Sequence, residues 1–261
     1  MTDLRPITLI TGASVGIGAA LARVFAANGH ETVLVARREQ LLTQLADEIA
    51  ATGAPRPIVL RADVARIDAA RRIGEQLTAL GVEPEILVNN AGFGLVGEAA
   101  ELSRSEQLSM IDLNIRALTD LSLAFVDPLV RHRGGILNVA SIAAFLPGPG
   151  MAVYYASKAY VLSFSEALHQ ELSSRGVRVT ALCPGPVPTE FQARAGVKAF
   201  KYPRALTRSP ERVAEEGYQA FRQGRRVVIP GFANRLVTRL VAFFPRQRLL
   251  RVIDARNRDR S

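Results

Sequence analysis

The feature that most constrains the fold is a regular alternation of short apolar runs with longer helical patterns. We predict strands from the apolar, β-branched runs at residues 7–11, 32–36, 58–61, 86–88, 136–139, 177–183 and 227–229. Helical patterns between them cover residues 38–51, 67–79, 104–131 and 156–174. Helical crossovers join parallel strands, and right-handed crossovers place helices on both faces. The sequence therefore predicts an α/β fold, a doubly wound parallel sheet of about seven strands with its ligand cleft at the carboxyl ends of the strands.

Composition narrows the class of protein. A chain of 261 residues, 48% of them hydrophobic, fits one large α/β domain. No run approaches the ~18 apolar residues of a membrane span, and Asp3 with no small-residue cleavage site argues against a secretory signal. Cys183 is the only cysteine, so an internal disulfide is excluded, and its apolar neighbours indicate a packed thiol. We expect a cytoplasmic location.

Charge is placed very unevenly along the chain. Residues 222–261 hold 11 arginines against Asp254 and Asp259, which accounts for the whole net charge of +9. The remainder of the chain is neutral. We therefore divide the chain into a body, residues 1–231, which is neutral as far as residue 221, and a basic extension, residues 232–261, which is too short to be a domain of its own.

A glycine-rich turn follows the first predicted strand. Gly12, Gly16 and Gly18 lie between this strand and a run of apolar residues at helical spacing. Glycine accepts a positive φ and lets the backbone approach a ligand closely, and the N–H groups that open a helix favour an anion. The turn, which contains Ser14 and Ile17, predicts a pyrophosphate site, although an ordinary glycine-rich turn has the same pattern.

Two arginines follow the second predicted strand, in the segment VLVARREQ. An acidic residue here would bond the adenosine ribose hydroxyl of NAD, whereas arginine suits the additional phosphate of NADP. Arg37 and Arg38 precede the first carboxylate, Glu39, so the segment favours NADP. A solvated arginine at the start of a surface helix is the alternative interpretation.

Polar residues also end the third and fourth predicted strands. Asp63, beside Val64, is expected either to accept a hydrogen bond from the adenine amino group or to cap the next helix. In LVNNAGFG, Asn89 and Asn90 are expected to bond the backbone on both sides, and Gly92 permits a close approach to the cofactor.

A hydroxyl, a phenol and an ammonium group are expected at the same cleft. Tyr154 and Lys158 are four residues apart and share a helix face, and Ser141 ends the fifth strand thirteen residues before Tyr154. A nearby cation lowers the pKa of a phenol. We expect Lys158 to lower the pKa of Tyr154, Tyr154 to transfer a proton, and Ser141 to hydrogen-bond the substrate oxygen.

Together these motifs closely resemble the short-chain dehydrogenase/reductase family. The pattern T-G-x-x-x-G-x-G stands at residues 11–18, N-N-A-G at 89–92 and Y-x-x-x-K at 154–158, with Ser141 at the family's distance. The resemblance implies a Rossmann-type fold for the body and NADP(H) as the cofactor. It also implies hydride transfer between the nicotinamide and a carbonyl or alcohol carbon.

The resemblance assigns further roles by position. Asn114 matches the family's helix asparagine, which holds a water in the proton relay, and P-G-x-V-x-T at residues 184–189 matches the segment beside the nicotinamide. The expected catalytic residues are Asn114, Ser141, Tyr154 and Lys158. The expected cofactor-binding residues are Gly12, Ser14, Gly16, Ile17, Gly18, Arg37, Arg38, Asp63, Val64, Asn90, Ala91, Gly92, Tyr154, Lys158, Pro184, Gly185, Val187 and Thr189. No metal is expected.

The substrate is less well indicated. The family's variable loop falls at residues 190–208, where Phe191, Phe200 and Tyr202 suit an apolar substrate but also suit simple packing. A helix with Ser209 as its N-cap follows this loop. The extension resembles that of fatty-acyl and steroid carbonyl reductases, which favours a lipophilic ketone, such as a 3-oxoacyl or steroid-like substrate. An NADP-binding regulatory or membrane-surface module with incidental turnover is the alternative.

The extension itself contains an amphipathic pattern. Leu236, Val237, Leu240, Val241 and Phe244 fall on one helical stripe. We expect this stripe to dock on the body or on a second subunit of a dimer or tetramer, and regard peripheral contact with an anionic membrane as the less favoured interpretation. Nucleic acid is not expected, since the extension has no array of aromatic residues for base stacking.

Overall fold

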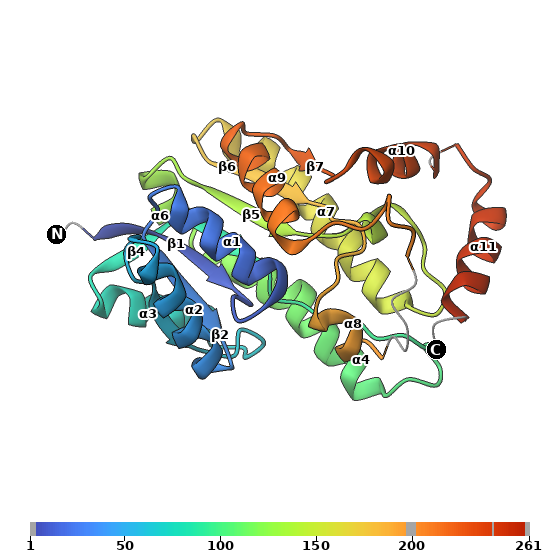
Figure 1. Cartoon of the computed structure of the whole chain (residues 1–261), viewed down its shortest axis with the longest axis horizontal. Coiled ribbons are helices and arrows are strands. Elements are labelled where there is room, and N and C mark those ends of the chain that lie inside the picture. The colour runs from blue at the N-terminus through green and yellow to red at the C-terminus, as the bar shows by residue number, and fades with distance from the viewer. Residues whose placement is uncertain (1–3, 197–201, 242, 259–261) are drawn as a thin grey trace.

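The computed structural model contains one seven-stranded sheet in the order β3-β2-β1-β4-β5-β6-β7 (Figure 1). It describes residues 4–196, 202–241 and 243–258, so Phe200 lies outside the described residues. The strands are β1 (Arg5–Thr11), β2 (Thr32–Ala36), β3 (Ile58–Arg61), β4 (Val82–Asn89), β5 (Gly135–Val139), β6 (Arg178–Leu182) and β7 (Val227–Val228). Each neighbouring pair is parallel, which confirms the predicted doubly wound fold.

Helices cover both faces of the sheet. They are α1 (Gly16–Ala27), α2 (Glu39–Ala51), α3 (Ala69–Ala79), α4 (Arg104–Ile111), α5 (Leu118–Ala124), α6 (Val126–Arg131), α7 (Ala152–Ser173), α8 (Glu190–Arg194), α9 (Pro210–Arg222), α10 (Phe232–Val241) and α11 (Arg246–Arg258). The short turns η1 (Asp112–Ala117) and η2 (Ile142–Phe145) are π-helical and 3₁₀-helical. One core contains α1, α2 and α9, and the other contains α3, α5, α6 and α7.

The strands supply both cores because successive side chains point to opposite faces of the sheet. Leu9 and Val33 belong to the core under α3 and α7, whereas their neighbours Ile10 and Leu34 belong to the core under α1 and α9. All four are completely buried. A strand buried on both faces reads as a continuous apolar run, and this is the pattern that the sequence shows.

β4 begins four residues earlier than predicted. The charge of Glu83 and the proline that follows concealed this part of the strand in the sequence. Glu83 is buried but accepts hydrogen bonds from Arg131 and from His132 Nε2, at 2.8 Å in the second case. Pro84 has no N–H for the ladder, and the register of β1 against β4 shifts beside it, between Ile7 and Thr8.

The predicted helix at residues 104–131 is interrupted. A π-helical turn, η1, separates α4 from α5, and Phe125 leaves the helical conformation before α6 begins at Val126. Pro128 explains the second break, since proline is tolerated only in the first turn of a helix. By contrast, α9 has the predicted ends: Ser209 Oγ accepts from the N–H of Arg212, and Gly224 has a φ of +66°.

The extension forms α10 and α11, which lie at the far end of the molecule from the N-terminus (Figure 1). The predicted docking of its apolar stripe on the body is wrong for most of the stripe. Leu236, Leu240 and Phe244 are 45%, 48% and 60% exposed, whereas Asn234 and Thr238 are buried. The polar face docks because Asn234 Nδ2 donates to the carbonyls of Leu206 and Pro230, at 3.1 and 2.9 Å. Among the described helices, none has the length and apolar character required to cross a bilayer.

Candidate active site

A cleft of about 870 Å³ opens at the carboxyl ends of the central strands. Parallel strands of a doubly wound sheet bring their following loops together at this edge. The loops after β1, β2, β4, β5 and β6 all contribute to the cleft, and α8 covers part of it. Every catalytic or cofactor-binding residue that the sequence predicts lines the cleft except Gly18 and Asn114, which lie behind its wall.

The glycine turn is held in place by the loop after β4. Gly12 and Gly16 have φ values of +65° and +62°, and a Cβ on Gly18 would lie 2.3 Å from the Gly12 carbonyl oxygen. Asn90 Nδ2 donates to the carbonyls of Thr11 and Gly12, at 3.0 and 3.1 Å. The turn is therefore a fixed cradle with backbone exposed to the cleft, and this cradle fits a pyrophosphate.

Arg38 connects the glycine turn to the opposite wall of the cleft. Its guanidinium donates to Ser14 Oγ at 3.2 Å and to Glu190 Oε2 at 2.9 Å. Arg37 is exposed at the same edge. Both arginines thus lie where β2 ends, at the position predicted to distinguish NADP from NAD.

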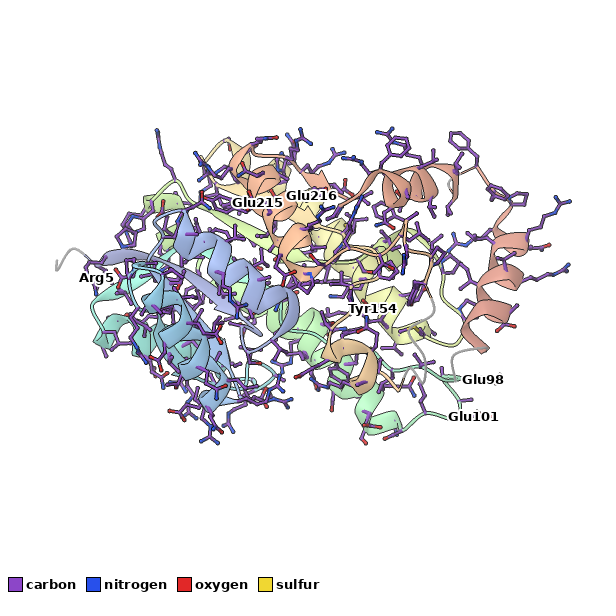
Figure 2. All side chains as sticks on the ribbon, in the orientation of Figure 1. Arg5, Glu98, Glu101, Tyr154, Glu215 and Glu216 are labelled. Atoms are coloured by element: carbon purple, nitrogen blue, oxygen red, sulfur yellow. The ribbon has the colours of Figure 1, made fainter. Side chains whose placement is uncertain are left out.

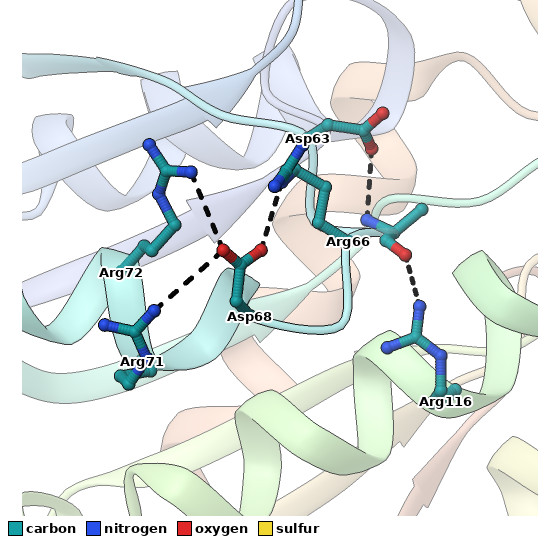
Figure 3. Close-up of polar contacts among 7 residues, drawn as sticks. Asp63, Arg66, Asp68, Arg71, Arg72 and Arg116 are labelled. Atoms are coloured by element: carbon teal, nitrogen blue, oxygen red, sulfur yellow. Dashed lines mark hydrogen bonds and ion pairs between the residues drawn. The ribbon is translucent and has the colours of Figure 1, made fainter.

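Asp63 closes the turn that follows β3. Its Oδ1 accepts from the Ala65 N–H at 3.0 Å, and the Ala65 carbonyl in turn accepts from Arg116 (Figure 3). Figure 3 also shows that Asp68, not Asp63, holds the nearby Arg66, Arg71 and Arg72. The predicted helix cap at Asp63 is wrong, because α3 begins at Ala69 with Asp68 as its N-cap. Asp63 and Val64 both line the cleft, and the adenine contact of Asp63 stays a prediction.

Ser141, Tyr154 and Lys158 meet on the floor of the cleft. Tyr154 lies near the middle of the molecule (Figure 2), one helical turn before Lys158 on α7. Ser141 follows β5 as the N-cap of η2 and forms a side-chain hydrogen bond with Tyr154. Lys158 is buried, with its Nζ 5.9 Å from the centroid of the Tyr154 ring and 2.8 Å from the Val139 carbonyl oxygen, to which it donates.

The pKa values of these groups follow from burial. Burial raises the pKa of Tyr154, and the hydrogen bond with Ser141 acts in the opposite direction. Burial also lowers the pKa of Lys158 to about 8. Lys158 lies beside the Tyr154 ring but donates to a backbone carbonyl, and burial gives Tyr154 a raised pKa overall, so a lowering of that pKa by Lys158 stays a prediction. Burial raises the pKa of Cys183 to about 12, which confirms a packed, unreactive thiol.

Asn114 lies in the π-helical turn η1, behind the cleft. Its side chain accepts from the Phe93 N–H at 3.1 Å and donates to the Phe93 carbonyl and to Ser157 Oγ, at 2.9 and 3.0 Å. It therefore fixes the loop after β4 to α7. A Cβ on Gly92 would lie 3.0 Å from Asn114 Oδ1, so glycine allows this close packing. Single π-helical turns often occur at functional sites.

The loop after β6 joins the cleft to the extension. Pro184, Gly185, Val187 and Thr189 all line the cleft. A Cβ on Gly185 would lie 2.5 Å from Asn234 Nδ2, so α10 packs directly behind this loop. Thr189 caps α8, and its Cγ2 would lie 3.1 Å from a Cβ on Gly16. α8 therefore begins immediately above the glycine turn.

Sequence reasoning missed several residues at or behind the cleft. Arg194 lines it from α8, and Val237 and Ile253 line it from the extension. A buried polar chain also lies behind it: Asn89 Nδ2 donates to Ser122 and Asn138, and Asn138 Nδ2 donates to Ser165. Asn89 thus bonds side chains, not the backbone as predicted. The sequence could have indicated Asn138, because it is a polar residue inside an apolar strand, but no sequence pattern indicates Arg194.

Comparisons with known proteins agree with this geometry. The model of the short chain dehydrogenase family matches residues 6–198. Sulfoacetaldehyde reductase 2 of Chromohalobacter salexigens is 39% identical over 191 residues, which cover 72% of this chain and 75% of that protein. An NADP-dependent 3-hydroxy acid dehydrogenase of Salmonella typhi is 36% identical over 220 residues, 80% of this chain and 86% of that protein.

A solved structure shows the same likeness over most of the chain. The short-chain dehydrogenase from Sphingobium yanoikuyae, in complex with NADPH, aligns with a TM-score of 0.79 and 31% identity, over 92% of this chain and 96% of that chain. Its fold, the family model and the curated relatives lead to one conclusion. This chain is an oxidoreductase that belongs to the short-chain dehydrogenase family.

Proposed function

We propose that this protein reduces a carbonyl compound with NADPH and that the carbonyl compound is a lipophilic ketone. The observation that carries the proposal is the meeting of Ser141, Tyr154 and Lys158 on the floor of one cleft, beside the glycine turn. Relatives that are NADP-dependent or solved with NADPH support the choice of cofactor. When bound, the nicotinamide supplies the hydride.

The residues of the cleft divide the remaining work. Ser141 hydrogen-bonds the substrate oxygen, and Tyr154 donates the proton that this oxygen needs as it becomes an alcohol. Burial raises the pKa of Tyr154, so the phenol is protonated near neutral pH and is ready to act as the acid of a reduction. Lys158 places a positive charge beside this ring, and Asn114 holds the loop after β4 against α7.

The cofactor would lie along the loops that follow the strands. The cradle of Gly12, Gly16 and Gly18 suits the pyrophosphate, and Arg37 and Arg38 suit the additional phosphate of NADP. Asp63 and Val64 would border the adenine. The residues from Asn90 to Gly92 and from Pro184 to Thr189 would hold the nicotinamide half.

The substrate wall is largely apolar. It includes Leu95, Met151, Phe191, Tyr202, Leu206, Val237 and Ile253. Such a surface stabilises a bound alkyl or ring system by about 25 cal/mol for each Å² that is removed from water. The apolar character of this wall favours a long-chain or steroid-like ketone as the substrate, in preference to a small, charged aldehyde.

A spectrophotometric screen tests this proposal. The loss of NADPH absorbance would be followed with alkyl ketones of increasing chain length, a 3-oxoacyl thioester, a steroid ketone and sulfoacetaldehyde. We expect kcat/KM to rise with apolar size. Turnover of sulfoacetaldehyde alone would contradict the substrate class, and tight NADPH binding without any turnover would favour the regulatory alternative.

A further inference from the structure

Arg194 reaches the cleft from the short helix α8 and has no established role there. Its guanidinium carbon lies 4.2 Å from the centroid of the Phe93 ring, in the loop that follows β4. Arginine is often found over an aromatic face, and the contact removes water from one side of the guanidinium. Among the residues that the structure describes, no carboxylate forms an ion pair with Arg194.

The surroundings of Arg194 are positively charged. Partial burial lowers its pKa, and the charges of Arg37 and Arg38 lower it further, whereas the more weakly acting Asp63 raises it. Arg38 is already paired with Glu190, one helical turn before Arg194 on α8. Three guanidinium groups therefore line this part of the cleft closely enough for their charges to act on one another. Because like charges repel, this arrangement is stabilised when an anion binds among them.

The position of α8 indicates which anion fits. The N-cap of this helix, Thr189, packs against Gly16 of the glycine turn. Arg38 ties the same helix to Ser14 of that turn, through hydrogen bonds of 2.9 Å to Glu190 and 3.2 Å to Ser14. Arg194 lines the same cleft from the last residue of this short helix.

We propose that Arg194 binds a phosphate group of the dinucleotide from the α8 side of the cleft, as a third cation in addition to Arg37 and Arg38. The proposal rests on the proposed function, which supplies the dinucleotide. Guanidinium and phosphate form short, charge-assisted hydrogen bonds, commonly in pairs. α8 would in this way hold the cofactor and contribute to its affinity.

The test is a fluorescence titration of the full chain with NADPH and with NADH. It compares the wild type with Arg194→Gln, Arg194→Lys and the control Arg222→Gln. The control removes another arginine that lies over a ring, Tyr218, at 6.0 Å and outside the cleft. We expect Arg194→Gln to weaken NADPH binding by about tenfold to hundredfold, Arg194→Lys to weaken it less, and Arg222→Gln to leave it unchanged.

The two nucleotides separate the possible phosphates. A loss confined to NADPH assigns Arg194 to the 2′-phosphate, and an equal loss for NADH assigns it to the pyrophosphate; either result supports the proposal. Binding by Arg194→Gln should also depend less on salt than binding by the wild type, because one ionic contact is missing. A purely structural role would shift thermal unfolding without changing this salt dependence.

Other results would overturn the proposal. If Arg194→Gln binds both nucleotides as tightly as the wild type, the inference fails and the proposed function stands. If binding is unchanged but KM for sulfoacetaldehyde rises, Arg194 serves an anionic substrate instead. If the wild type binds neither nucleotide, the proposed function fails and this inference fails with it.

Discussion

The two walls of the cleft are built in different ways. The wall beside the glycine turn is fixed by buried hydrogen bonds, such as those from Asn90 to Thr11 and Gly12. The wall made by the extension docks through Asn234 and Thr238 and leaves Leu236 and Leu240 exposed. The groups that need fixed positions therefore lie on the sheet's strand ends and on α7, which are held by buried contacts. The extension lines the cleft with Val237 and Ile253 and leaves much of its apolar surface exposed.

The largest expected effect is at Lys158, on the fixed side. Lys158→Met should lower kcat by about 10²–10⁴-fold, the range for loss of a group that assists proton transfer. The same change should increase stability, because burial lowers the pKa of Lys158 from 10.5 to about 8 and the folded state therefore disfavours the charged form.

The size of this stability effect depends on pH. The penalty of about 3 kcal/mol is fully present below pH 8, decreases as pH rises toward 10.5, and is absent above that value. Urea unfolding of the wild type and of Lys158→Met at pH 7 and pH 10.5 measures it. A variant that is less stable than the wild type at pH 7 would contradict this account of the floor of the cleft.

The next effect concerns cofactor choice at the end of β2. Replacing Arg37 and Arg38 together by alanine should weaken NADPH binding by about tenfold to hundredfold, with a much smaller loss for NADH. Calorimetric titration with each nucleotide gives both values. Arg56→Ala, which removes an exposed arginine paired with Asp47, serves as the control. Equal losses for the two nucleotides would show that these arginines do not contact the 2′-phosphate.

On the side of the extension, Asn234 should matter more than the apolar stripe. Asn234→Ala leaves the carbonyls of Leu206 and Pro230 without their donor, so we expect a loss of about 1–3 kcal/mol in the free energy of unfolding. Arg235→Ala, at the exposed neighbouring position, should change it by less than about 0.5 kcal/mol. Similar values for the two variants would mean that α10 is not anchored through its polar face.

The smallest effect on stability is expected at Phe243 and Phe244, which are 86% and 60% exposed. Changing both to serine should alter the free energy of unfolding of the dilute protein by less than about 0.5 kcal/mol. Sedimentation velocity then tests whether a second subunit covers them, since the variant would associate less. Salt-sensitive binding of the wild type to anionic vesicles would instead favour the membrane interpretation.

The sequence was most informative where a residue type is required by backbone geometry or by the sheet. The parallel fold, the glycine turn, the ends of α9 and the shared helix face of Tyr154 and Lys158 were all predicted. These features depend on local patterns, namely glycine at positive φ, a serine N-cap and the spacing of apolar residues.

Features that depend on tertiary contacts were not predictable in this way. The charge of Glu83 favours a loop in the sequence, but in the fold Arg131 and His132 lie beside Glu83 and hydrogen-bond its carboxylate inside a strand. Burial raises the pKa of Tyr154, and the Lys158 ammonium donates to the Val139 carbonyl; neither follows from the spacing of the two residues. The sequence predicted that α10 docks on the body, but α10 docks through its polar face and not through its apolar stripe. This could not be predicted, because the close approach of Asn234 to Gly185 joins residues that are far apart in the chain.

The central claim is that Tyr154, on the fixed side of the cleft, donates the proton of a carbonyl reduction. The most direct measurement compares NADPH affinity and kcat in the wild type, Tyr154→Phe and Tyr155→Phe, since the two tyrosines are neighbours with ring centroids 6.1 Å apart. We predict that Tyr154→Phe retains NADPH affinity but loses turnover by about 10²–10⁴-fold, while Tyr155→Phe keeps most of its activity. A Tyr154→Phe variant with normal turnover, or a greater loss in Tyr155→Phe, would contradict the account.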